Sequence, residues 1–92
     1  MKLTFEWDES KAKNNLRKHN VGFDEGKTIF NDPFLLTFPD LDNSGNEARY
    51  ISIGLSDRDR ILLLIHTDRH GRIRIISCRK ATTRERRYYE EG

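Results

Sequence analysis

Three strand-like segments follow one another in the second half of the sequence, with only short turns between them. They span Arg49–Leu55, 61–67 and 73–79. In the first segment isoleucine and leucine alternate with small or polar residues, which predicts a strand with one buried face. The second begins with five consecutive apolar residues, as a central strand does. Because tight turns at 57–59 and 70–71 separate the three, the sequence predicts an antiparallel meander.

The start of the sequence predicts a short strand over residues 5–7 and then a helix over residues 9–19. Asp8 is a good N-cap for this helix. The helix is expected to end at Asn20 and Gly22, because both residues tolerate a left-handed backbone. Its predicted buried face carries the following residues: Ala12, Asn15 and Leu16.

A second, shorter helix is predicted over residues 24–30, because Pro33 prevents its continuation. Residues 34–38 are apolar and end at Pro39, which predicts an edge strand beside the meander. A polar loop over residues 40–46 then leads into the first strand of the meander.

The end of the sequence predicts one more helix. Thr82 and Glu85 have the spacing of a capping box, and the helix runs on through Tyr88, Tyr89 and Glu90. The expected fold is therefore a single α+β domain over residues 1–92. It consists of two N-terminal helices, a four-stranded antiparallel sheet and a C-terminal helix.

Charge is distributed unevenly along the chain. The 17 Lys and Arg and 15 Asp and Glu residues give a net charge of only +2. Eight basic side chains and one acidic side chain, Glu85, nevertheless lie between Arg69 and Tyr88. A basic block beside a sheet suggests a polyanionic partner, most simply nucleic acid. The alternative is a solvated arginine surface that binds nothing.

The sequence also limits the compartment and the cofactors. The single cysteine, Cys78, excludes a disulfide within the chain, and no apolar run is long enough to span a membrane. The first residues do not form a signal peptide, so a cytoplasmic location is expected. His66 and His70 are four residues apart, but one is expected in a strand and the other in a turn, so they do not converge as a helical pair would. With one cysteine, neither a metal site nor another cofactor is expected.

Six segments together resemble one known family, the BrnT toxins. The segments are Phe5-Glu6-Trp7-Asp8, Asn15-Leu16-Arg17-Lys18-His19, Phe23-Asp24-Glu25, Phe30-Asn31-Asp32-Pro33, Ile73-Arg74-Ile75-Ile76-Ser77-Cys78-Arg79-Lys80-Ala81 and Glu85-Arg86-Arg87-Tyr88-Tyr89-Glu90. The resemblance implies a RelE-like ribonuclease, the toxin of a type II toxin–antitoxin system, which arrests translation. It also implies a BrnA-type antitoxin that carries the DNA-binding element and represses the operon.

Small departures from the family pattern concern three places. Asn20 stands where the family usually has glycine, and Cys78 stands where alanine is common. The pair Tyr88-Tyr89 leaves open which tyrosine is the family's, and the following Glu90 favours Tyr89.

Metal-independent RNA cleavage needs a base for the 2′-hydroxyl, cations for the phosphate and an acid for the leaving oxygen. Arg79 is the leading candidate for the phosphate clamp, or else a surface arginine paired with Glu85. Glu85 either orients Arg79, acts as the base or only caps its helix. Tyr89, one helical turn later, either stacks on a base or packs its helix onto the sheet.

Other candidate site residues are histidines and basic side chains. His19 ends the first predicted helix beside Lys18 and serves as an acid, a phosphate ligand or a C-terminal cap. His66, in the central strand, is expected to be a hydrogen-bonded core histidine. The predicted RNA-binding residues are Lys18, Arg49, Arg69, Arg74 and Lys80.

Two functions are consistent with these residues. The first is an RNA-cleaving toxin that is neutralised by its antitoxin. The alternative is a non-catalytic module that binds the antitoxin and acts as a co-repressor of the shared operon, touching operator DNA only through that partner.

Overall fold

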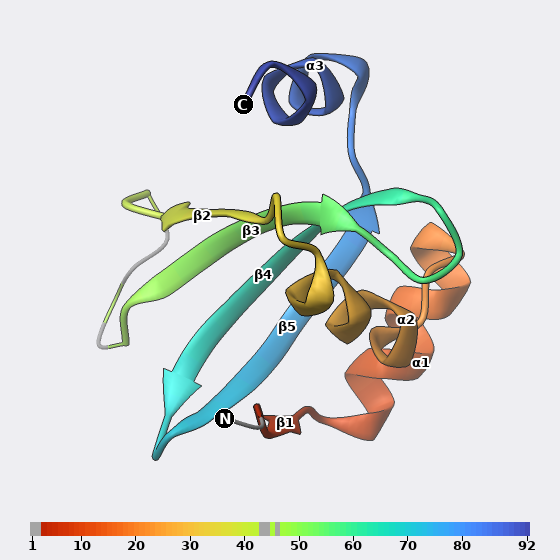
Figure 1. Cartoon of the computed structure of the whole chain (residues 1–92). Helices are drawn as coiled ribbons and strands as arrows, with labels where there is room; N and C mark the ends of the chain where they lie inside the picture. Colours follow the sequence, from red (N-terminus) through yellow and green to blue (C-terminus); the bar gives the residue numbers. More distant parts are fainter. Residues whose placement is uncertain (1–2, 43–44, 46) are drawn as a thin grey trace.

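The computed structural model, which describes residues 3–42, 45 and 47–92, places a mixed five-stranded sheet between two layers of helices (Figure 1). The elements in chain order are β1 (Phe5–Glu6), α1 (Glu9–His19), α2 (Phe23–Gly26), the 3-10 helix η1 (Lys27–Asn31), β2 (Leu36–Pro39), β3 (Arg49–Leu55), β4 (Ile61–Arg69), β5 (Arg72–Lys80) and α3 (Thr83–Glu91). Within the described ranges, no helix has both the length and the apolar composition needed to cross a membrane.

The sheet differs from the predicted four-stranded antiparallel meander. Its order is β1-β5-β4-β3-β2, and β1 pairs in parallel with β5, with Phe5 opposite Ile73. The short strand near the start was predicted, but the prediction of a four-stranded, purely antiparallel sheet was wrong, because the parallel partner of this strand lies far along the chain. The α+β class, the edge position of β2 and the central position of β4 are confirmed.

Local signals place most helix and turn boundaries. The Asp8 carboxylate accepts hydrogen bonds from the amides of Ser10 and Lys11, and Asn20 ends α1 with a left-handed φ of 57°. His70 and Gly71 both have positive φ, as a two-residue hairpin turn requires. The second predicted helix is instead divided into α2 and η1. The predicted loop over 40–46 lies partly outside the described residues.

One face of the sheet packs against α1, α2 and η1. The buried cluster on this face comprises Val21, Phe23, Ile29, Leu62, Leu64, Ile75 and Cys78. A register shift between Ile65 and His66 breaks the alternation of β5, so Ile75 and Cys78 both face the helices although they are three residues apart. Strict alternation along residues 73–79 predicts that Ile75 and Arg79 share a face, and the register shift makes this prediction wrong.

The buried face of α1 also differs from the prediction. Leu16 is 51% exposed, whereas Asn15 is 8% exposed. The Asn15 amide donates to the carbonyl oxygens of Val21 (3.0 Å) and Cys78 (2.7 Å), and its Oδ1 accepts from the Cys78 amide at 3.2 Å. These bonds attach α1 to the last part of β5, so a polar side chain supplies an anchor that apolar periodicity does not reveal.

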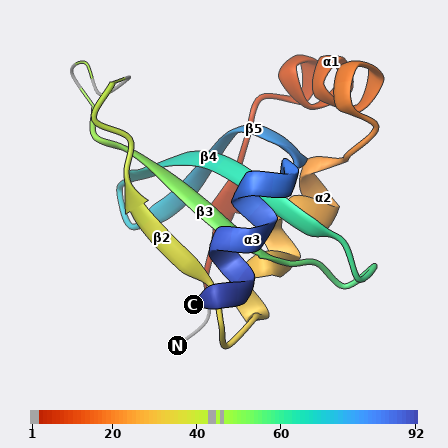
Figure 2. The ribbon, with the colours of Figure 1, turned by 90° about the horizontal axis from the view of Figure 1, so that it is seen from above.

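The opposite face of the sheet is covered by α3 alone among the described helices, and Figure 2 shows this helix crossing over the strands. No residue of α3 is buried. Its Tyr88 ring lies edge-on to Phe38 at 6.2 Å, and the two enclose a pocket whose floor is formed by Ile51, Ile53 and Leu63. This layer is therefore thin and held by a few contacts.

Candidate active site and RNA interface

Arg79 and Glu85 form a two-pronged ion pair at the end of β5. Arg79 Nη1 lies 2.8 Å from Glu85 Oε1, and Nη2 lies 2.9 Å from Oε2. The same carboxylate accepts from the Thr82 amide at 2.8 Å, and the Thr82 hydroxyl accepts from the Glu85 amide at 3.2 Å. Glu85 therefore completes the capping box and holds the Arg79 guanidinium at once.

The electrostatics of this pair bear on the role of Glu85. The hydrogen bond from Arg79 lowers the pKa of the Glu85 carboxyl, and the same bond raises the pKa of Arg79. A carboxylate whose pKa is lowered is a weak proton acceptor near neutral pH. The geometry thus favours orientation of Arg79 as the role of Glu85 over that of a general base.

Tyr89 lies on the same helix but is engaged elsewhere. Its hydroxyl donates to Asp32 Oδ2, and the Asp32 carboxylate also accepts from the amides of Phe34 (2.9 Å) and Leu55 (2.8 Å). Leu55 ends β3, two strands away from β5, a separation of about 10 Å. Burial and this hydrogen bond raise the pKa of Tyr89 to about 12, so the phenol stays protonated and ties the end of α3 to the sheet.

Lys18 and His19 lie on the other side of the sheet from Arg79. They are in the last turn of α1, which packs on the face of the sheet covered by α1, α2 and η1. Arg79 instead pairs with Leu63, which lies on the opposite face beneath α3. His19 makes no side-chain hydrogen bond with any residue that the structure describes. The structure thus does not bring His19 and Arg79 together.

Three of the five predicted RNA-binding residues lie together, far from Arg79. Arg49, Arg69 and Arg74 lie at the β4–β5 hairpin end of the sheet, about 16 Å along β5 from Arg79. Arg69 Nη2 is 2.7 Å from Glu47, Arg74 Nη1 is 2.8 Å from Glu6, and Arg49 also has an interaction partner. Of the two predicted residues outside this group, Lys80 directly follows Arg79 at the opposite end of the strand, and Lys18 is in α1.

A second group of basic residues, at the end of β5 where Arg79 lies, was not predicted in full. A pocket of about 360 Å³, here called the strand-end pocket, is lined by Asp59 and Arg60 before β4, Lys80 of β5, and Thr83 and Arg86 of α3, with two apolar residues. The charge count over 69–88 had singled out this part of the chain but could not place Arg60 beside it. Asp32 was likewise missed as the partner of Tyr89, although it lies in the Phe30–Pro33 motif.

A family model described as the ribonuclease toxin BrnT of type II toxin–antitoxin systems matches residues 7–85. The chain belongs to the BrnT family. The match contains Arg79, Lys80 and Glu85, whereas Arg86 and Tyr89 lie beyond its end. No curated protein matches the sequence significantly.

A solved structure has a similar fold. It is the crystal structure of the ribonuclease toxin BrnT of Brucella abortus, with a TM-score of 0.68 over 89% of this chain and 100% of that chain. The two sequences are 22% identical, so this likeness shows the fold alone.

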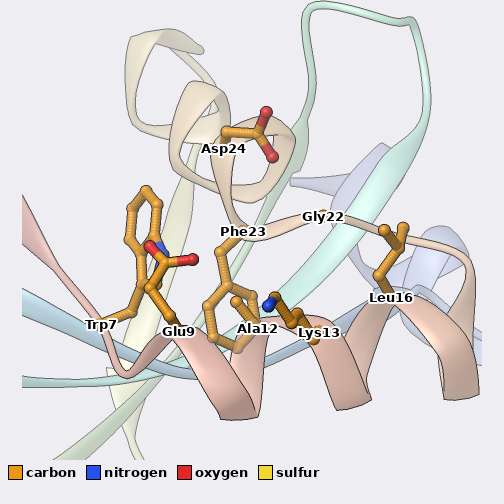
Figure 3. Close-up of a pocket in the computed structure, with 8 residues that line it drawn as sticks. All are labelled: Trp7, Glu9, Ala12, Lys13, Leu16, Gly22, Phe23 and Asp24. Carbon is orange, nitrogen blue, oxygen red and sulfur yellow. The ribbon is translucent and has the colours of Figure 1, made fainter.

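Two other features of this BrnT-family chain concern predicted residues. Figure 3 shows a groove of about 350 Å³ between α1 and α2, where Trp7 stands beside Phe23. The Trp7 indole donates to Glu9 at 3.0 Å, and Leu16 lines the far end of the groove. This groove contains none of the predicted catalytic residues. Within residues 3–42, 45 and 47–92, no three His, Cys, Asp or Glu side chains are grouped to hold a metal ion.

His66 is a core histidine in the structure, as predicted. The residue is 6% exposed, its ring lies between Phe30 and Tyr50, and its Nε2 is 2.8 Å from the Ser52 hydroxyl. Burial lowers its pKa from 6.5 to about 4, so the imidazole is neutral at physiological pH. His66 therefore contributes to the interior and does not reach the Arg79–Glu85 pair.

Proposed function

We propose that this chain is a cytoplasmic, RelE-like endoribonuclease toxin that cleaves RNA without a metal ion and thereby arrests translation. The RNA 2′-hydroxyl gives up its proton and attacks the adjacent phosphate, the bond from phosphorus to the 5′-oxygen breaks, and the departing 5′-oxygen takes up a proton. Arg79 stabilises the negative charge that develops on the phosphate during this exchange. Glu85 is a positioning residue that holds the guanidinium in place. The proton-transfer role of His19 and the base-stacking role of Tyr89 stay predictions.

The observation that carries this proposal is the state of the Arg79 guanidinium. Two of its five N–H groups donate to Glu85 and one donates to the Lys80 carbonyl at 3.2 Å. The remaining donors are available, and the side chain is 36% exposed. A phosphate can therefore bind to Arg79 without displacing Glu85, which keeps the cation fixed during the reaction.

Three variants test the proposal. Arg79→Ala is expected to lower the rate of RNA cleavage by about 10²–10³-fold and to abolish growth arrest on expression. Glu85→Gln keeps an oxygen that can cap Thr82 but loses the negative charge, so its loss of activity is expected to be smaller. Arg72→Ala is the control, because Arg72 lies at the far end of β5, 61% exposed and 3.7 Å from Glu6.

Stability separates catalysis from folding in this experiment. A partly exposed ion pair contributes about 1 kcal/mol or less, so Arg79→Ala should remain folded at 25 °C. Cleavage at the wild-type rate by folded Arg79→Ala protein would refute the proposed site. Equal losses in Arg72→Ala and Arg79→Ala would show that general positive charge, and not this guanidinium, is responsible.

The proposed partner is a BrnA-type antitoxin, through which the pair contacts operator DNA. Apolar side chains on the α3 side of the molecule support such an interface, since Phe34 is 74% and Tyr88 is 64% exposed. The same surface supports the alternative function, a non-catalytic antitoxin-binding co-repressor. Growth arrest that depends on Arg79 favours the toxin, whereas operator repression without any RNA cleavage favours the alternative.

A further inference from the structure

The strand-end pocket combines three cations from parts of the chain that are distant in sequence. Arg60 precedes β4, Lys80 ends β5 and Arg86 lies in the first half of α3. Asp59 is the acidic residue of the lining, and Thr83 also lines the pocket. These cations outnumber the acidic residue of the lining, so the pocket of about 360 Å³ is an electropositive site for an anionic group.

Arg60 is fixed in this pocket by a buried carboxylate. Arg60 Nε donates to Glu25 Oε2 at 2.9 Å, its Nη2 donates to Glu25 Oε1, and Nη2 also lies 3.4 Å from the Asn20 carbonyl oxygen. Glu25 is 5% exposed and accepts a further hydrogen bond from Ser56 at 2.7 Å. The hydrogen bond from Arg60 lowers the pKa of Glu25. The pair therefore holds one wall of the pocket rigid.

The other two cations are uncompensated. Neither Lys80 nor Arg86 forms an ion pair with a residue in the described part of the chain. Both residues are exposed. By contrast, the predicted RNA-binding residues Arg69 and Arg74 are both neutralised by glutamates. Lys80 and Arg86 thus bring free positive charge into the strand-end pocket, close to Arg79.

We propose that the strand-end pocket binds a backbone phosphate of single-stranded RNA, one that neighbours the phosphate held by Arg79. Lys80 directly follows Arg79 at the end of β5, and the two side chains leave the strand on opposite faces. RNA therefore passes around the end of β5 from Arg79 to Lys80 and Arg86. This inference rests on the proposed function and assigns Lys80 and Arg86 to substrate binding, with the Glu25-paired Arg60 as a fixed wall of the pocket.

The test measures the salt dependence of RNA binding by the full chain. The probe is a single-stranded 2′-O-methyl RNA 12-mer, which lacks the attacking hydroxyl, and its Kd is measured by fluorescence anisotropy between 50 and 200 mM salt. Each lost phosphate contact lowers the slope of log K against log salt by about 0.7. Lys80→Ala and Arg86→Ala should each show this change, so that raising the salt fourfold weakens their binding about 2.6-fold less than it weakens wild-type binding.

Two further variants serve as matched comparisons. Arg87→Ala removes an exposed arginine next to Arg86 on the same helix but outside the pocket, and its slope should equal that of the wild type. Asp59→Asn removes the acidic residue of the lining and should bind the probe more tightly. Asparagine suits this position because Asp59 has a left-handed φ of 61°.

The outcomes separate this inference from the proposed function. The proposed phosphate site would be refuted if Lys80→Ala and Arg86→Ala showed the wild-type slope. It would also be refuted if the slope for Arg87→Ala fell as much as theirs. If the wild type still cleaves unmodified RNA in that case, the proposed function stands. A wild-type chain that neither binds the probe nor cleaves RNA would overturn both.

Discussion

Acidification from pH 7 to pH 4.5 should destabilise this protein through His66. The neutral ring is packed between Phe30, with ring centroids 5.3 Å apart, and Tyr50, at 5.8 Å, and is hydrogen-bonded to Ser52. Charging it inside the sheet is costly, because burial has lowered its pKa from 6.5 to about 4. The unfolded chain therefore binds a proton at a pH at which the folded chain does not.

The sign and size of the effect follow from this difference in pKa. A group whose pKa is lower in the folded state contributes stability that is complete above pH 6.5 and is lost as the pH falls towards 4. The whole difference corresponds to about 3 kcal/mol of unfolding free energy, of which about 2 kcal/mol disappears between pH 7 and pH 4.5. The carboxyls of Glu25, Asp32 and Glu85 have lowered pKa values, so they keep accepting their hydrogen bonds as carboxylates until the pH falls below this range.

Urea unfolding monitored by the fluorescence of Trp7, the single tryptophan, measures the loss. The midpoint of the wild type should fall by about 1–2 M between pH 7 and pH 4.5. His66→Gln retains an amide that can bond to Ser52 but does not titrate, so its midpoint should change much less. His70→Asn is the control, because His70 is exposed in a turn with a left-handed φ of 53°. Equal pH dependence in the wild type and His66→Gln would refute the reasoning.

Four further predictions follow from the same structure. RNA cleavage should survive EDTA; activity that disappears on chelation and returns with a divalent ion would contradict the metal-independent mechanism. The chain, a monomer or weak dimer alone, should form a stable hetero-oligomer with the product of the neighbouring antitoxin gene, and light scattering that shows no change on mixing would contradict this. Glu25→Gln should lower the unfolding free energy by about 2 kcal/mol, because the Arg60 guanidinium loses its buried anionic partner; an unchanged urea midpoint would contradict it. Gly54→Ala should lower the unfolding free energy by about 1–2 kcal/mol, since a Cβ there would lie 3.0 Å from Ile29 Cβ and 3.2 Å from the Ile29 carbonyl oxygen. A melting temperature equal to that of the wild type would contradict this and show that η1 can shift.

The candidate site was only partly predictable. Arg79 and Glu85 are six residues apart, so the strand end and the capping box at Thr82 place them together from local sequence alone. The partners of Tyr89 and of Arg60 are 57 and 35 residues away from them. Such contacts depend on which strand ends meet at one edge of the sheet, and local patterns do not contain that information.

Local sequence therefore determined the caps of the helices, the His70-Gly71 turn and the order of the antiparallel strands, because each depends on backbone preferences and on neighbours within a few residues. Only the tertiary structure decided that β1 joins β5 in parallel and that the shift at Ile65/His66 redirects Ile75. It also decided which arginines are neutralised by glutamates and which cations surround one pocket. The physical reason is that long-range pairing and charge compensation depend on the packing of the whole sheet, whereas capping and turn geometry are properties of the local chain.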